Sequence, residues 1–114
     1  MVTQKMEAFK RALMEAVDEG LLMLGENGRE VIYFRLRQSY ALKKEDIPGH
    51  PEIFVRCLRS IFGAGAEVIE RAIIKSLYRK LGMEFNVKKG FGFLEYLNEA
   101  LKAFEEEPEL SLRK

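Results

Sequence analysis

The sequence predicts an all-α fold, a compact orthogonal bundle of about five helices. Apolar residues recur at spacings of three and four through most of the chain, and Gly or Pro separates the periodic segments. These positions do not hold a heptad register, which argues against a long coiled coil. The chain has 114 residues, of which 47% are hydrophobic, enough for one core. We expect a single domain over residues 1–107 and a flexible tail at residues 108–114.

The first predicted helix covers residues 3–24, with Thr3 as N-cap and Gly25 as the stop. Met14 and Leu22 fall off its apolar stripe and predict a second contact face. The stripe consists of Met6, Phe9, Leu13, Ala16, Val17, Leu21 and Leu24.

A second helix is predicted over residues 28–41, where Asn27 and Glu30 have the spacing of a capping box. This helix is apolar on two sides. Val31 and Phe34 lie on one side, and Ile32, Leu36 and Tyr40 lie on the other. A helix that is apolar on most sides is usually central in a bundle, so we expect a central position. A strand over residues 31–34 is the alternative, which the flanking caps disfavour.

Residues 43–51 contain Pro48, Gly49 and Pro51, which predict a loop without regular structure. Pro51 suits the first turn of a third helix. The apolar stripe of that helix consists of Phe54, Cys57, Leu58, Ile61 and Phe62.

Residues 61–66 read Ile-Phe-Gly-Ala-Gly-Ala and predict a tight hinge at Gly63, Ala64, Gly65 and Ala66, where small residues let two helices approach closely. A phosphate-binding loop is the other interpretation. It fails because no strand precedes the segment and Val68 stands where a third glycine is needed.

A fourth helix is predicted over residues 66–81, ended by Gly82, and a fifth over residues 92–106, stopped by Pro108. Residues 83–90 form a basic connector in which residues 84–87 favour a short strand-like stretch.

The sequence offers few candidates for a nucleophile, an acid–base group or a metal ligand. Cys57 is the only cysteine and lies on an apolar stripe, so we expect an inert, packed thiol. His50, the only histidine, is near Asp46 and Glu52, which permits either a metal or acid–base site or a solvated loop; the second fits better because no other His or Cys is present. The sequence therefore predicts no enzyme, no cofactor and no metal.

Charge is unevenly distributed, although the net charge is only +1. Residues 29–89 hold thirteen Lys or Arg against seven Asp or Glu. One set of basic side chains predicts contact with a partner or with nucleic acid. Nearby Glu67 and Glu70 can pair with it, and only Ser76 is available to read base edges, which favours a protein partner. The set is Arg56, Arg59, Arg71, Lys75 and Arg79.

No apolar run approaches the roughly 18 residues that cross a bilayer, and the N-terminus lacks the pattern of a signal peptide. We expect no membrane association and a cytoplasmic protein. Abundant Lys, Arg and Glu with little Asn, Gln or Cys is typical of a heat-adapted organism.

Segment 61–66 is also the most specific part of a family resemblance, which includes Ile47-Pro48, Pro51, Phe54, Leu58, Ile69-Glu70, Ile73 and Leu77-Tyr78, with Gly20-Leu21 and Ile32-Tyr33 also fitting. Over residues 12–100 the chain resembles a small uncharacterised archaeal family of helical output domains, found alone or appended to signalling proteins. The resemblance implies a regulatory or interaction role and supplies no catalytic or ligand residues.

We therefore expect a non-enzymatic interaction module that binds a protein partner, with a homodimer among the candidates. Its surface would combine the basic set with leftover apolar residues such as Met14, Leu22, Ile74 or Tyr78. The alternative is a nucleic-acid-binding transcriptional regulator that uses the basic face of residues 56–80.

Overall fold

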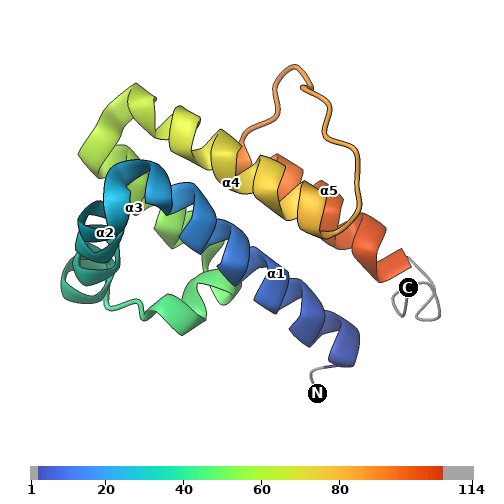
Figure 1. Ribbon diagram of the computed structural model, residues 1–114, viewed down its shortest axis with the longest axis horizontal. Helices are drawn as coiled ribbons and strands as arrows, with labels where there is room; N and C mark the ends of the chain where they lie inside the picture. The colour runs from blue at the N-terminus through green and yellow to red at the C-terminus, as the bar shows by residue number, and fades with distance from the viewer. Residues whose placement is uncertain (1–2, 107–114) are drawn as a thin grey trace.

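The computed structural model describes residues 3–106 and confirms the all-α class, with no strand in that range (Figure 1). Its radius of gyration of 14.1 Å is near the ~13 Å of a compact domain of this size. The predicted tail at residues 108–114 and the stop at Pro108 lie outside the described residues. The helices are α1 (Gln4–Leu21), α2 (Gly25–Tyr40), α3 (Pro51–Phe62), α4 (Ala66–Lys80) and α5 (Phe93–Glu106), with short 3-10 helices η1 (Leu22–Leu24), η2 (Lys44–Gly49) and η3 (Gly63–Gly65).

The most extensive helix contact joins α1 to α4, which run in opposite directions through the middle of the molecule (Figure 1). The two helices lie close together at Gly20, where an added Cβ would be 2.3 Å from Cγ1 of Ile73. Ile73 is fully buried. A side chain at position 20 would therefore push the two central helices apart.

Local signals fixed the start of α1 but not the start of α2. The Thr3 hydroxyl accepts a 3.0 Å bond from the amide of Met6, which confirms the N-cap. The predicted capping box at Asn27 is wrong: α2 begins at Gly25 without a side-chain cap, and Asn27 lies inside the helix. Gly25 has a φ of 81°, so the chain turns from η1 into α2 there.

The predicted central position of α2 is also wrong. α2 lies at the edge of the bundle (Figure 1), and only one of its two apolar sides is covered. Ile32, Tyr33 and Leu36 are buried, whereas Val31 and Phe34 are exposed. The Tyr33 hydroxyl donates to Asp18 of α1 and thereby ties the inner side of α2 to the core.

Residues 43–51 contain more regular structure than predicted. η2 occupies Lys44–Gly49, held by bonds between residues three apart, such as the 3.0 Å bond from the amide of His50 to the carbonyl of Ile47. Ile47 is buried and anchors the segment. Pro51 opens α3 as predicted.

The hinge predicted at Gly63–Ala66 contains η3 and the first residue of α4, but close helix approach does not explain its two glycines. An added Cβ at Gly63 would meet no atom within 4 Å, and one at Gly65 would meet only the Cβ of Phe62, at 3.9 Å. A glycine is favoured at position 63 because the backbone there has a positive φ of 58°, which glycine adopts without strain. Gly65 has a helical φ of −64°, which any residue can adopt.

The connector between α4 and α5 lies against a side chain of α4 that was predicted to be on the surface. Gly82 ends the α4 segment with a φ of 72°, as predicted. No strand forms at residues 84–87. Phe85 instead packs edge-on against Tyr78 at 5.6 Å between ring centroids. Tyr78 and Ile74 are consequently buried, so their proposed place on an outer surface is wrong.

The hydroxyl of Tyr78 joins α4 to α5. Its single O–H hydrogen is shared between two acceptors, the carbonyl of Tyr96 at 2.8 Å and Oε1 of Glu99 at 2.6 Å. Glu99 also accepts a bond from Lys88 of the connector. Burial, together with the bond to Glu99, raises the pKa of the Tyr78 hydroxyl well above its usual value.

Candidate functional site

The described surface exposes six large apolar side chains, and four of them fall into two groups. Single exposed apolar residues are ordinary, but neighbouring ones mark a candidate interaction surface. The six are Leu22, Met23, Val31, Phe34, Val68 and Val87.

The first group is the outer face of α2, formed by Val31 and Phe34. The two side chains are 58% and 55% exposed and lie one helical turn apart on the same face. The guanidinium of Arg37 lies 5.9 Å from the centroid of the Phe34 ring. Glu30 flanks the face at its other end with 65% of its side chain exposed, and its carboxylate lies 3.4 Å from Nε of Arg29. An apolar centre with a charged border results, the layout of a protein interface.

The second group lines a shallow groove of about 390 Å³ between η1 and α4. Met23 and Val68 supply its apolar wall and are 54% and 61% exposed. Arg71 and Lys75 of α4 line it with two basic side chains, and Glu67 lines it with an acidic one. The groove therefore combines exposed apolar surface with two members of the predicted basic set.

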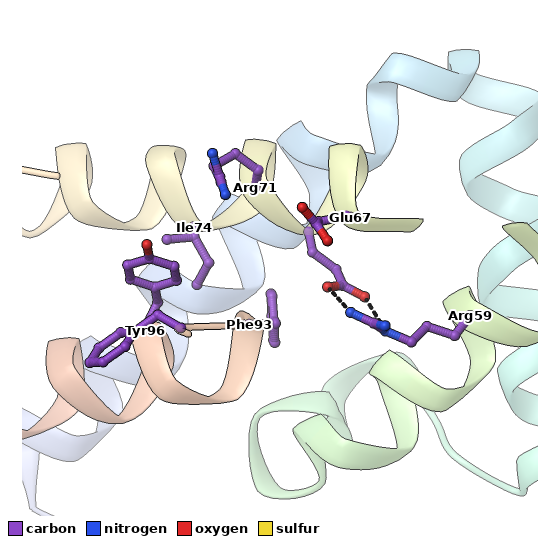
Figure 2. Close-up of a pocket in the computed structure, with 9 residues that line it drawn as sticks. Arg59, Glu67, Arg71, Ile74, Phe93 and Tyr96 are labelled. Carbon is purple, nitrogen blue, oxygen red and sulfur yellow. Dashed lines mark hydrogen bonds and ion pairs between the residues drawn. The ribbon is translucent and has the colours of Figure 1, made fainter. Parts of the chain in front are cut away.

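A third feature is a small cavity between α3, α4 and α5 (Figure 2). Arg59 donates two bonds to the buried carboxylate of Glu70, at 3.1 and 3.2 Å. These bonds raise the pKa of Arg59 above its usual value. Phe93 and Tyr96 close the opposite side. The cavity volume of about 70 Å³ is far below the ~300 Å³ of a typical small-molecule site, so we assign the pair a structural role.

The predicted basic set is divided by its partners. Arg59 is held by Glu70, and Arg79 pairs with Glu19 at 3.2 Å. Arg71 and Lys75 both lie 5.9 Å from the ring of Phe85. Arg56 is exposed on α3. Two of the five charges are thus compensated by carboxylates within the fold.

The residues that carry reactive groups lie apart from these surfaces. His50 Nδ1 is 3.9 Å from the Glu52 carboxylate, and both side chains are exposed. Within residues 3–106, no group of three His, Cys, Asp or Glu side chains is placed to hold a metal. Cys57 is fully buried, and burial raises its pKa. No helix in the same range is long and apolar enough to span a bilayer.

Sequence reasoning missed the exposed face of α2, although it recognised that the helix has two apolar sides. Met23 and Val68 were missed because neither follows the stripe of its own segment. Of the apolar residues named for the surface, Leu22 is exposed and Met14 is half-buried. Comparison with protein-family models, with curated proteins and with solved structures found no match to this chain.

Proposed function

We propose that this chain is a non-enzymatic helical module that binds a protein partner through the outer face of α2. The observation that carries the proposal is the pair of adjacent exposed side chains, Val31 and Phe34. Neither contributes much to the core, because more than half of each side chain remains in solvent. Burial in an interface would remove this apolar surface from water, at ~25 cal/mol for each Å².

The border of the face supports binding to a protein. Arg37 and Glu30 offer charges of both signs beside the apolar centre. Aromatic and Arg side chains are enriched among the residues that contribute most to protein–protein affinity. The regulatory, output-type part of the proposal rests on the family resemblance over residues 12–100, and cytoplasmic residence rests on the shortness of the apolar runs in the sequence.

Site-specific photo-crosslinking in the cells of origin tests the proposal. We expect a photo-reactive phenylalanine analogue at position 34 to form a covalent adduct with a polypeptide, either another protein or a second copy. The same analogue at position 87 is the control, because Val87 is even more exposed than Phe34 but lies in the connector. Adducts that are equal at the two positions, or absent at position 34, would contradict the proposal.

Binding of nucleic acid is the second candidate function, and one observation favours it. Arg71 and Lys75 each lie 5.9 Å from the ring of Phe85, and basic side chains beside an aromatic ring are a common way to hold single strands. The pairing of Arg59 with Glu70 and of Arg79 with Glu19 weakens this candidate.

A further inference from the structure

The outer face of α2 carries its charges in an order that reverses about its middle. Acidic Glu26 and Glu30 lie in the N-terminal half and basic Arg37 lies in the C-terminal half, all three exposed. The helix runs from Gly25 to Tyr40, so its midpoint lies halfway between Val31 and Phe34. If the helix is rotated by 180° so that its ends exchange places, the basic half lies where the acidic half was. The apolar pair stays at the centre.

The charged residues also share one flank of the helix. Glu26, Glu30 and Arg37 are separated by four and seven residues, which places them in one row at 3.6 residues per turn. Arg35 lies roughly 160° around the axis from Arg37 and so belongs to the opposite flank. Arg35 is exposed, and it follows Val31 by four residues, so it borders the apolar pair on that side.

We propose that the partner of this face is a second copy of the chain, with the two α2 helices packed antiparallel about a two-fold axis between Val31 and Phe34. This inference rests on the proposed function, because it uses the same face. Val31 then faces the partner's Phe34, and Glu30 faces the partner's Arg37. A parallel arrangement would oppose like charges, whereas the antiparallel one pairs opposite charges at both ends.

Sedimentation and light scattering of the purified chain test for the dimer. We expect a dimer whose population falls on dilution. Phe34→Ser should raise the dimer dissociation constant at least roughly tenfold, because each dimer loses two central aromatic side chains. Val87→Ser is the control and should leave the dissociation constant unchanged, because Val87 is an exposed apolar residue of the connector, outside the α2 face. A monomer at every concentration overturns the inference.

A charge exchange tests the antiparallel geometry. Glu30→Arg makes the flank basic and Arg37→Glu makes it acidic, so each variant alone should be monomeric. Mixing the two variants should give a heterodimer, and combining both changes in one chain should restore the homodimer. Arg56→Glu, on the exposed side of α3, is the control with the same change of charge and should dimerise normally. Circular dichroism verifies that each variant is folded. A mixture that stays monomeric, or an Arg56→Glu chain that also fails to dimerise, overturns the arrangement.

The two levels of the proposal fail in different ways. If the analogue at position 34 captures a different protein while the purified chain is monomeric, the self-association is wrong and the interaction module stands. If position 34 captures nothing and the chain is monomeric, both are wrong.

Discussion

Gly20 of α1 and Ile73 of α4 lie so close that a methyl group on Gly20 would overlap the Ile73 side chain, at 2.3 Å from Cγ1. The backbone of Ile73 is also only 3.2 Å from that position. Cγ1 is bonded to Cβ, so it is not the free end of a flexible side chain, and the fully buried Ile73 has no room to turn away. The contact sets the distance between the two central helices.

Gly20→Ala should therefore destabilise the protein by about 1–3 kcal/mol, the usual cost of overpacking a core, despite the higher helix propensity of Ala. Chemical denaturation measures the change. Ile73→Ala removes Cγ1, so the double variant should lose less than the sum of the two single losses. If the losses of the two single variants add up to the loss of the double variant, the Gly20–Ile73 contact does not limit how closely the helices pack.

Gly63 and Gly65 should respond differently to substitution. Gly63→Ala places a side chain at a φ of 58° with a ψ of −134° and should cost about 1–3 kcal/mol. Gly65→Ala, at a helical φ with open space around it, should be neutral or stabilising by up to about 1 kcal/mol. Thermal melts of both variants check this. If Gly65→Ala lost more stability than Gly63→Ala, close helix approach would again be the reason for the small residues.

Arg59→Ala should destabilise the fold more than Arg56→Ala on the same helix. Glu70 is only 3% exposed, and loss of Arg59 leaves its carboxylate buried without the cation that holds it. We expect a cost of about 1–3 kcal/mol for Arg59→Ala and less than about 0.5 kcal/mol for the exposed Arg56. Urea denaturation of the two variants measures both changes in the free energy of unfolding. Equal effects would remove the structural role that we assign to the ion pair.

Stability should fall at alkaline pH because Tyr33 and Tyr78 are protonated more strongly in the folded state. Burial raises the pKa of both hydroxyls above the unfolded value of 10.0. Their contribution is therefore complete below pH 10.0 and decreases as the pH rises beyond it, where the unfolded chain loses the protons first.

Tyr78→Phe should reduce this alkaline loss and, near neutral pH, cost about 1–2 kcal/mol for the bonds to Tyr96 and Glu99. Denaturation series at neutral and alkaline pH, with Tyr40→Phe as an exposed-hydroxyl control, measure both effects. An identical alkaline slope in wild type and Tyr78→Phe would exclude Tyr78 as a source.

Duplex and single-stranded oligonucleotides at low salt separate the two candidate functions. For a protein-interaction module we expect no measurable binding by the wild type. Binding that falls steeply with salt, and that weakens in an Arg71→Ala, Lys75→Ala double variant, would instead favour the nucleic-acid candidate. Arg79→Ala is a useful comparison, because Arg79 is already paired with Glu19.

The helical class, Thr3 as a cap and Gly82 as a stop depend on residues within one or two turns of each other, so the sequence alone determined them. The same local reasoning misplaced the start of α2, because a capping-box spacing does not require the box to form.

Only the tertiary structure decided which apolar faces are covered. Ile74 and Tyr78 are buried by a connector and a helix that follow them in the chain, and Val31 and Phe34 are exposed because α2 lies at the edge. Likewise, Gly20 and Ile73 are 53 positions apart, and their contact exists only once α1 and α4 pack. Periodicity shows that a helix has an apolar face; which neighbour covers it depends on how all the helices pack together.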